Sequence, residues 1–476
     1  MKNNYIIWES IDWKHVNYRV EKLQKRIAQS AEDKNWNKLR HLQKMLMNSF
    51  YARLLAVHRV TSKKSKRTPG LDGKFWFTDE EKFEAVERLK LEYKNYHFSP
   101  FMRIYVLKEN DKTKTRPLSI PIIFDRAMQS LYLLAIDPVV EFMADKHAYG
   151  FRKNRSAQDA IKDIRYNFRL MTTNQWILKA DIHGCFDHIS HDYLIKSCPF
   201  DKQLITNLLK CGYIYRNKYY PTEEGIPQGG VLSPVLSTLC LSNFEKIIES
   251  KFNDSVKIVR FVDDYLISGT TKEQLEEVLK ILKLYLSERN LTLSDEKTKI
   301  KHITQGVNFI GWNIKKINHQ IVILPTYKSY LEMIKHITER INQGNNWSKE
   351  KLIKNLNDLI TGWGLYHNYA CAPHMYTELD EIIYNLLLNW CKNQQPYESE
   401  KWLINKYFIK LSSNVRVFGT KENHVKRLDM LAIGDTENNI YFKNPYLYPR
   451  TEIIKKRVIW KGEDNYLIKP FHLKFH

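Results

Sequence analysis

Two adjacent aspartates, Asp263 and Asp264, are the side chains of this sequence best suited to chemistry. They interrupt the apolar run RFVDDYLIS at residues 260–268, which predicts a strand, a tight turn and a second strand with both carboxylates at the hairpin tip. Adjacent carboxylates between apolar runs are costly unless a cation lies between them and other acids, and Mg²⁺ prefers such hard oxygen ligands. A surface β-turn is the alternative interpretation, because turns favour aspartate in any case.

A third carboxylate, Asp181, ends the predicted strand WILKADI at residues 176–182. Acids at the ends of separate strands can hold two divalent ions, which stabilise the attacking and leaving oxygens of an in-line phosphoryl displacement. One ion would lower the pKa of a primer 3′-hydroxyl, and the other would neutralise a triphosphate. Asp187 and Asp192 are nearby alternative ligands, although Asp187 has the position of a helix-start or turn acid.

Two further segments could contact a substrate. The segment 223–244, EEGIPQGGVLSPVLSTLCLSNF, has paired glycines that allow backbone to approach a ligand closely, and a helix is predicted after them. A tight loop before a core helix explains this segment equally well. Upstream, Lys108 and Arg116 lie on a predicted hairpin and are suited to clamping a triphosphate. The alternative for these two residues is a solvated basic turn.

The composition favours a nucleic-acid partner. Seventy-five Lys and Arg against 53 Asp and Glu give a formal charge of +22, which attracts a polyanion. The 28 Tyr, 21 Phe and 11 Trp could stack on bases, although core packing also explains them. No apolar run approaches the ~18 residues that span a bilayer, and the first residues are too polar for a secretory signal, so we expect a soluble cytoplasmic protein without a membrane partner. The six cysteines have no zinc-type spacing and are predicted to be reduced, mostly buried thiols.

The elements that must position these residues form an α+β pattern. The 476 residues, with 43% hydrophobic and 27% charged, favour several globular units and exclude a disordered or fibrous chain. Short strand-like runs alternate with helical stretches in the middle of the chain, whereas helical periodicity dominates both before and after them. We therefore expect a basic helical extension, a catalytic α+β domain, a helical domain and a small appendage, at residues 1–70, 71–320, 321–410 and 411–476.

Taken in order, these segments resemble reverse transcriptases of the group II intron and group II-like lineage, over nearly the whole chain. The segments that resemble the fingers are TPGLDG (68–73), RPLSIPIIFDRAMQ (116–129) and AYGFRKNRSAQDAI (148–161). Those that resemble the palm are ADIHGCFDHISH (180–191), GIPQGG (225–230), FVDD (261–264) and LTLSDEKTKI (291–300). The primer grip is represented by VNFIGW (307–312), and the helical thumb, or domain X of intron maturases, by LIKNLNDLITGWGLYHNYA (352–370).

The resemblance implies a right-hand polymerase with fingers, palm and an α-helical thumb. Its activity would be RNA-directed DNA polymerisation, in which dNTPs are added to a 3′-hydroxyl with two Mg²⁺ ions, or with Mn²⁺. The partners would be a structured RNA template, from an intron or a noncoding RNA, and a DNA or RNA primer. The biological role is either that of an intron-encoded protein or that of a host-co-opted antiviral defence enzyme. The alternative function is an RNA-binding splicing maturase whose polymerase activity is dispensable.

The resemblance also assigns roles residue by residue. Asp181, Asp263 and Asp264 would be the catalytic metal ligands, with Ile182 beside them at the metal site. Phe186, five positions after Asp181, would be the steric gate that excludes a ribonucleotide 2′-hydroxyl. The remaining substrate-binding residues would be Lys108 and Arg116 at the triphosphate, Gln228 and Gly229 at the nucleotide and template, and Lys297 at the pyrophosphate. The predicted nucleic-acid contacts are Arg67, Arg152, Arg155, Gly311, Trp312 and Trp363.

The sequence departs from the family pattern at a few positions. Phe261 and Val262 replace the commoner Tyr-Ala before the aspartate pair, which keeps an apolar strand. After the thumb there is no cysteine-pair and HNH-type endonuclease module, so DNA cleavage is not expected. The template RNA, the source of the primer and the oligomeric state do not follow from the residues.

Overall fold

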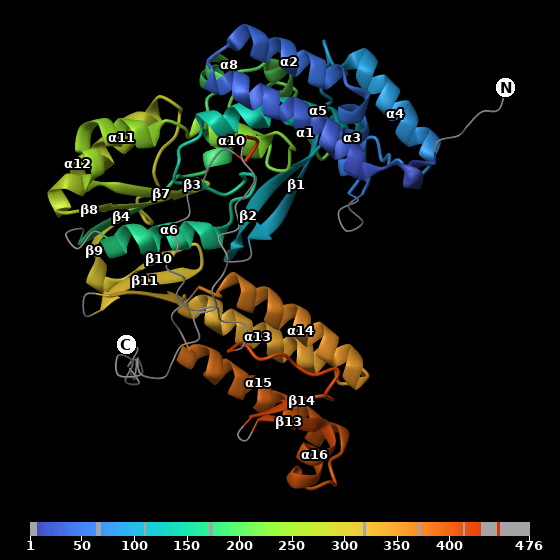
Figure 1. The fold of residues 1–476 in the computed structure, drawn as a ribbon, viewed down its shortest axis with the longest axis vertical. Helices are drawn as coiled ribbons and strands as arrows, with labels where there is room; N and C mark the ends of the chain where they lie inside the picture. The colour runs from blue at the N-terminus through green and yellow to red at the C-terminus, as the bar shows by residue number, and fades with distance from the viewer. Residues whose placement is uncertain are drawn as a thin grey trace. The chain divides into compact units, whose positions relative to one another are not determined.

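The computed structural model describes residues 7–62, 68–108, 111–170, 175–317, 320–369, 373–412, 415–429 and 445–447. It confirms the predicted α+β class (Figure 1). The chain divides into two compact units, and each is considered by itself. The first consists of Met1–Ser156, Leu178–Ile300 and Tyr441–Thr451, and the second of Ala157–Ile177, Lys301–Ile440 and Glu452–His476.

Helices dominate the N-terminal part of the first unit. After the 3₁₀ turn η1 (Trp8–Ser10) come α1 (Trp13–Glu32), α2 (Trp36–Asn48), α3 (Phe50–Thr61) and α4 (Asp79–Glu92). The first turn of α1 is capped by Asp12, whose carboxylate accepts the backbone N–H groups of Lys14 and His15, and Thr78 and Glu81 form a capping box at α4. The helices expected between residues 1 and 70 are therefore present in the described part of that segment.

The long helix α5 (Ile123–Met143) is the centre of this unit and packs against α1, α2 and α3 (Figure 1). Almost all of its side chains are buried. Two buried glutamines tie the outer helices to it, because Gln24 donates to the carbonyl of Leu134 and Gln43 to that of Ala135. Each buried amide thereby keeps a hydrogen-bond partner, which avoids the cost of an unsatisfied polar group.

Two sheets carry the predicted strands of the catalytic region. The first has the order β2-β1-β5-β6, and the second has the order β3-β7-β8-β4-β9. The strand bounds are Phe101–Lys108 for β1, Asp111–Ile120 for β2, Ala148–Tyr149 for β3, Trp176–Asp181 for β4, Tyr213–Tyr215 for β5, Lys218–Tyr220 for β6, Lys257–Phe261 for β7, Asp264–Gly269 for β8 and Lys299–His302 for β9.

The remaining helices of the first unit mostly precede or follow these strands, and all of them except α12 are short. They are α7 (Cys185–His188), α8 (His191–Ser197), α9 (Lys202–Leu209), α10 (Ser233–Cys240), α11 (Phe244–Phe252), the 3₁₀ turn η2 (Asn253–Ser255) and α12 (Lys272–Ser287). Helix α10 is the one predicted after the paired glycines. It starts with Pro234 in its first turn, where the missing N–H costs no helical hydrogen bond.

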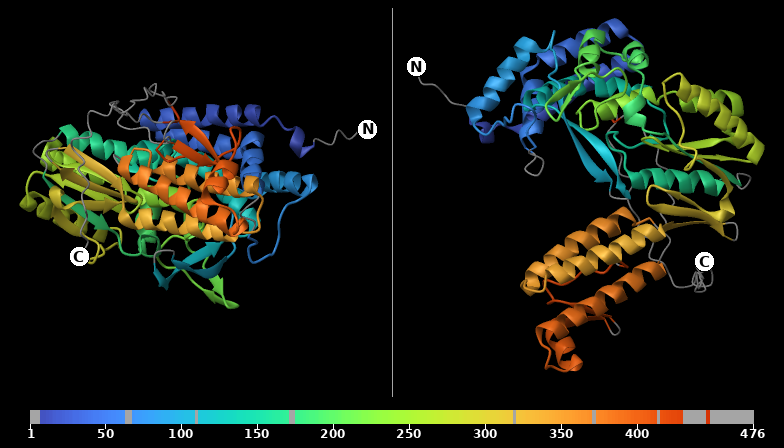
Figure 2. Two further views of the ribbon diagram at one scale, coloured as in Figure 1. Left: turned by 90° about the horizontal axis from the view of Figure 1, so that it is seen from below. Right: turned by 180° about the vertical axis from the view of Figure 1, so that it is seen from behind.

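The second unit is largely helical (Figure 2). Its elements are α6 (Ala157–Leu170), η3 (Ile303–Gln305), β10 (Val307–Phe309), β11 (Trp312–Ile317), β12 (Gln320–Pro325), α13 (Tyr327–Gln343), α14 (Lys349–Tyr366), α15 (Pro373–Gln394), α16 (Glu400–Tyr407), β13 (Phe408–Ser412) and β14 (Val415–Phe418). Helix α13 packs against both α14 and α15. The strand-like piece NVRVFG is confirmed as β14, and the piece NIYF lies outside the described residues.

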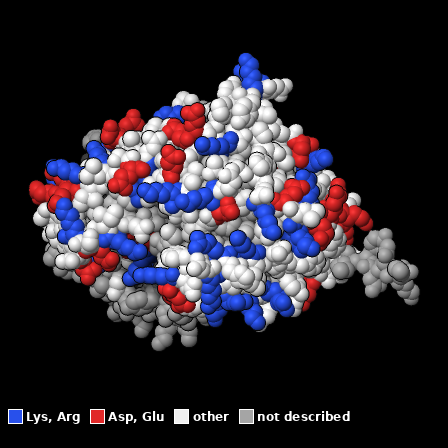
Figure 3. Space-filling view, turned by 90° about the horizontal axis from the view of Figure 1, so that it is seen from above, with Lys and Arg blue, Asp and Glu red and all other residues white. Residues whose placement is uncertain are grey.

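Other sequence-based expectations concern thiols, charge and membranes. Five cysteines are free thiols, of which Cys185, Cys198, Cys240 and Cys391 are buried, and Cys371 lies outside the described residues. Lys and Arg side chains form bands on the face shown in Figure 3, interspersed with acidic groups. None of the helices in the described segments is long and apolar enough to cross a membrane.

Candidate polymerase active site

The aspartate pair lies on the predicted hairpin. Strands β7 and β8 are antiparallel and Phe261 pairs with Asp264, so Val262 and Asp263 form a two-residue turn and Asp264 opens β8. Val262 has φ +58°, a left-handed conformation that is strained for a β-branched residue. Its N–H donates to the carbonyl of Tyr149 at 3.0 Å, so β3 holds the turn in this strained form.

Asp181 joins the pair from β4, the neighbour of β8 in the sheet. Its carboxylate shares a hydrogen bond with that of Asp264. On its other side, Oδ2 of Asp181 accepts a hydrogen bond from Nζ of Lys297 at 2.8 Å. The structure thus brings together the three predicted aspartates and Lys297, although they lie far apart in the sequence.

The surroundings penalise negative charge at this cluster. Burial raises the pKa of Asp264 to about 7, the charge of Lys179 opposes that rise, and the charges of Asp181 and Asp263 add to it. Burial also raises the pKa of Asp263, while the charges of Lys297 and Arg116 lower it. Arg116 therefore lies within electrostatic reach of the aspartates, on the hairpin where the sequence predicted it, and its strand pairs it with Val106. Lys108 ends β1, but its side chain lies outside the described residues.

One specific observation indicates that the aspartate cluster is suited to hold a cation. Oδ1 of Asp264 is buried and has no hydrogen-bond partner, which is costly for a carboxylate oxygen unless a cation or a proton satisfies it. Carboxylate oxygens are the ligands that Mg²⁺ prefers. Within the described part of the chain, no group of three or more His, Cys, Asp or Glu side chains is arranged closely enough to hold a metal ion. In this arrangement the ammonium of Lys297 contacts Oδ2 of Asp181.

Ile182 follows Asp181 and makes an isolated bridge with Leu293. Its side chain is 2% exposed and offers no ligand atom, so a role at the metal would have to use its backbone carbonyl. That role stays a prediction. The alternative ligands are differently placed, because Asp187 accepts a hydrogen bond from Gln228 and Asp192 is exposed in the first turn of α8.

The glycine-rich loop is clamped between β2 and the segment that carries Phe186. The Ser119 N–H donates to the carbonyl of Gln228 at 2.7 Å, and Nε2 of Gln228 donates to Oδ1 of Asp187 at 3.0 Å. Gly229 has φ +113°, and a Cβ on it would lie 2.7 Å from the carbonyl oxygen of Ser119. The close backbone approach expected of these glycines is therefore made to β2, and it fixes the loop next to the half-buried Phe186.

Two arginines predicted to contact nucleic acid are interior residues. All five N–H donors of Arg152 are used by Glu141 and by the carbonyls of Glu141, Asp145 and Ala148. The Arg155 side chain is 4% exposed and lies 3.5 Å from the same Glu141 carboxylate. In this arrangement Glu141 and backbone carbonyls hold both guanidiniums, and the contact of Arg152 and Arg155 with nucleic acid stays a prediction.

The residues of the second unit that are predicted to contact nucleic acid differ in their burial. Trp312 is fully buried, and its ring stacks on that of Tyr366 with the centroids 4.4 Å apart, so its contact with nucleic acid stays a prediction. Gly311, with φ +86°, turns the chain beside the same tyrosine. Trp363 is half-buried, and its Nε1 donates to the Ser329 hydroxyl at 3.1 Å. Arg67 lies outside the described residues.

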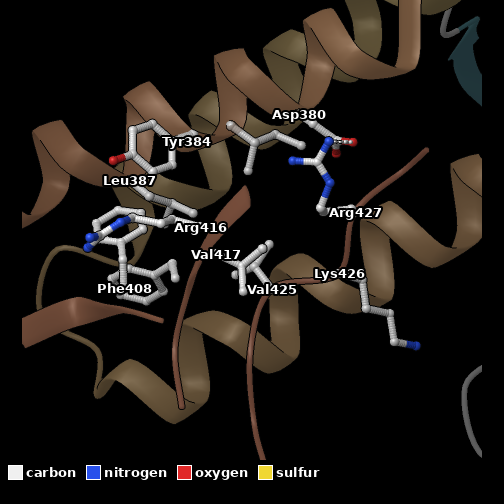
Figure 4. Close-up of a pocket in the computed structure, with 11 residues that line it drawn as sticks. Asp380, Tyr384, Leu387, Phe408, Arg416, Val417, Val425, Lys426 and Arg427 are labelled. Carbon is white, nitrogen blue, oxygen red and sulfur yellow. Dashed lines mark ion pairs between the residues drawn. The ribbon is translucent and has the colours of Figure 1, made fainter. Parts of the chain in front are cut away.

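The second unit contains a pocket whose polar contacts are structural (Figure 4). It is lined by α15, β13, β14 and residues 425–427. On its rim Arg427 lies 3.6 Å from Asp380, whose carboxylate also accepts the N–H groups of Leu428 and Asp429. These contacts fasten the segment after β14 to α15, which is a structural function.

Sequence patterns missed several residues that shape the site. Lys179 precedes Asp181 by two positions, and its charge lowers the pKa of Asp264. Tyr149 and Phe151 lie in the same segment as Arg152 and Arg155. The alternation of strand residues would have placed Lys179 on the face of Asp181. No sequence signal marks the positive φ of Val262 or Phe151, because neither is Gly, Asn or Asp.

Three family models match the chain one after another. Residues 8–89 match the N-terminal domain of reverse transcriptase, residues 106–314 match the reverse transcriptase (RNA-dependent DNA polymerase), and residues 330–408 match the group II intron, maturase-specific domain. The chain is thus similar to reverse transcriptases at residues 8–89 and 106–314, and to the maturase domain of group II introns at residues 330–408. Asp181, Asp263, Asp264 and Lys297 all lie inside the match to the reverse transcriptase domain.

Curated proteins similar to this chain include the group II intron-encoded protein LtrA of Lactococcus lactis subsp. cremoris, 28% identical over 331 residues, which cover 55% of this chain and 54% of LtrA. The chain thus spans about half the length of LtrA. Maturase-like protein 1 of Euglena gracilis is 26% identical over 415 residues, with 83% of this chain and 85% of that protein covered. A structure of apo telomerase from Candida tropicalis aligns with a TM-score of 0.41 at 13% identity, over 62% of this chain and 57% of that chain.

Proposed function

We propose that this chain is an RNA-directed DNA polymerase that adds deoxynucleotides to a primer 3′-hydroxyl. The observation that carries the proposal is the meeting of Asp181 and Asp264 from adjacent strands, with Asp263 in the turn beside them and one buried carboxylate oxygen left without a partner. In the reaction the 3′-oxygen bonds to the α-phosphorus, the bond from that phosphorus to the bridging oxygen breaks, and pyrophosphate leaves. Two Mg²⁺ ions, or Mn²⁺, would supply charge neutralisation and activate the 3′-hydroxyl when bound by the three aspartates.

The chain's own residues then have separate tasks. Arg116 lies close enough to influence Asp263, so its guanidinium is placed to hold the triphosphate of the incoming nucleotide. The contact with Asp181 raises the pKa of Lys297, so its ammonium stays charged, and it would position or protonate the departing pyrophosphate. Phe186 would exclude a 2′-hydroxyl, and the clamped loop at Gln228 and Gly229 would lie against the nucleotide and template.

The template in this proposal is a structured RNA. The net charge of +22 favours a polyanion, and contacts to phosphates make the affinity fall with increasing salt. Intron RNA would indicate an intron-encoded protein. A different noncoding RNA would indicate an enzyme co-opted by its host, for instance in antiviral defence.

The test is to purify the protein with the RNA that it retains and to add Mg²⁺ and labelled dNTPs without a primer. We expect DNA complementary to one discrete bound RNA, and sequencing both strands identifies the template. A retained RNA without product, even after a primed RNA template is supplied, would contradict polymerase activity.

A second function is favoured by the match of residues 330–408 to a maturase-specific domain. In this proposal the chain binds an intron RNA and promotes its splicing, independently of the aspartates. Splicing of the retained intron RNA by a variant with all three aspartates changed to Asn would support this function. Loss of splicing in a variant that still binds the RNA would contradict it.

A further inference from the structure

Phe151 has an unusual combination of backbone strain and exposure. Its φ is +56°, and it follows Gly150, whose φ is +82°. A non-glycine residue in the left-handed region is strained and is found mostly where the surroundings enforce it. The ring is 56% exposed, so burial of its own apolar surface does not compensate for that strain.

The chain on both sides of Phe151 is fixed. Before it, the carbonyl of Tyr149 accepts the N–H of Val262, and a Cβ on Gly150 would lie 2.6 Å from Cγ2 of Val262. After it, Arg152 is held in the interior by Glu141. Phe151 therefore lies between two fixed parts of the chain, the turn that carries Asp263 and the buried ion pair of Arg152 with Glu141.

The ring of Phe151 contacts the ring of Phe186. Their centroids are 6.3 Å apart with an interplanar angle of 83°, which is an edge-to-face arrangement. Phe186 stands on α7, a helix of only four residues, and its ring is half-buried. A short helix gives few neighbours that could fix a ring, so the contact with Phe151 restricts the orientations open to Phe186.

We propose that Phe151 is a positioning residue that holds the ring of Phe186 and thereby sets the discrimination between deoxyribo- and ribonucleotides. This inference rests on the proposed polymerase function and on the gate role of Phe186 within it. Arg152, Arg155 and Glu141 then act one step further away, because they fix the backbone from which Phe151 projects. An edge-to-face aromatic pair corresponds to about a 2- to 12-fold change in a rate ratio.

The test compares incorporation of dCTP and CTP opposite a template guanine, on a synthetic RNA template with a DNA primer, under single-turnover conditions. Phe151→Ala should lower the dCTP-to-CTP preference by about 2- to 12-fold. Phe151→Tyr keeps the aromatic edge and should restore the preference. Phe77→Ala removes another exposed aromatic ring, 62% exposed and in contact with Phe75, and should leave the preference unchanged.

A double-mutant cycle separates positioning from an independent contact. In a Phe186→Ala background there is no gate ring to hold, so Phe151→Ala should have no further effect on the preference. Additive effects of the two substitutions would overturn the inference. An unchanged preference in Phe151→Ala, in a wild-type background that polymerises, would also overturn it. A wild-type protein that incorporates neither nucleotide would refute the polymerase function itself, and this inference with it.

Discussion

Nζ of Lys297 lies 2.8 Å from Oδ2 of Asp181, and the two side chains form an ion pair at the aspartate cluster. The ammonium side chain is 61% exposed, so the contact contributes little to the stability of the fold. Its position is instead suited to reaching a phosphate that arrives at the aspartates. This relationship distinguishes a functional lysine from a structural one, and it can be tested.

Replacing Lys297 by Met should reduce the rate of polymerisation strongly and leave the fold intact. The loss of a proton donor and of positive charge at the triphosphate corresponds to roughly 10²-fold in rate. Single-turnover primer extension measures the rate, and urea denaturation measures the stability. Lys280→Met, at an exposed position of α12, is the control. A Lys297 variant with the wild-type rate would exclude this residue from the reaction.

Replacing Glu141 by Ala should destabilise the protein by about 3–5 kcal/mol, because it removes the buried carboxylate that pairs with Arg152 and Arg155. The control is Glu276→Ala, which removes an ion pair with Lys272 in which both side chains are 50% exposed, and it should change the stability by less than about 0.5 kcal/mol. Equal effects of the two substitutions on the free energy of unfolding would contradict the structural role of the ion pairs that Glu141 makes with Arg152 and Arg155.

Gly229→Ala should reduce polymerisation by at least roughly tenfold, because displacement of a positioning loop by a fraction of an ångström is costly in rate. The added Cβ would lie 2.7 Å from the carbonyl oxygen of Ser119 and force the loop away from β2. Gly73→Ala is a matched control, since Gly73 also has positive φ, +64°, but a Cβ there meets nothing within 4 Å. Similar losses of polymerisation in both variants would mean that backbone strain, and not the contact with β2, is responsible.

Asp125 should give the stability a characteristic pH dependence. Burial raises its pKa to about 7 from 3.8, while the Tyr96 hydroxyl and the Ser99 N–H donate to its carboxylate. The folded state therefore binds an extra proton between these two pH values, and the free energy of unfolding falls as the pH rises through that window, by at most about 1.4 kcal/mol per unit.

Asp125→Asn stays neutral and should lose this contribution. Relative to the variant, the wild-type protein should become less stable by on the order of 2 kcal/mol between pH 5 and pH 8. Urea denaturation of both proteins across this range measures the difference, in which all other titrations cancel. Parallel pH profiles of the two proteins would contradict the raised pKa.

The sequence predicted features that depend on local pattern and missed those that depend on distant partners. The hairpin of Asp263 and Asp264 follows from apolar runs around a turn, and the helix after the paired glycines follows from its own composition. By contrast, whether Arg152 faces solvent depends on Glu141 in a preceding helix, and whether Trp312 is buried depends on Tyr366. Neither pairing has a signature in the residues next to it.

The strained backbone of two residues could not be predicted from the sequence either. Val262 and Phe151 adopt positive φ although their side chains disfavour it, because β3 and the aspartate turn are held together by hydrogen bonds and close packing. Local propensity therefore predicts the ordinary conformation at both positions, and only the assembled site reveals the strained one.

The most direct test of the polymerase proposal is primer extension on a synthetic RNA template with Mg²⁺ and dNTPs, comparing the wild-type protein with Asp263→Asn, Asp264→Asn and Asp192→Asn. The first two variants remove carboxylates from the cluster, whereas Asp192 is an exposed acid on α8. We predict extension by the wild-type protein and by Asp192→Asn, and extension at background level by the other two. Extension by either Asp263→Asn or Asp264→Asn at the wild-type rate would contradict the assignment of this site.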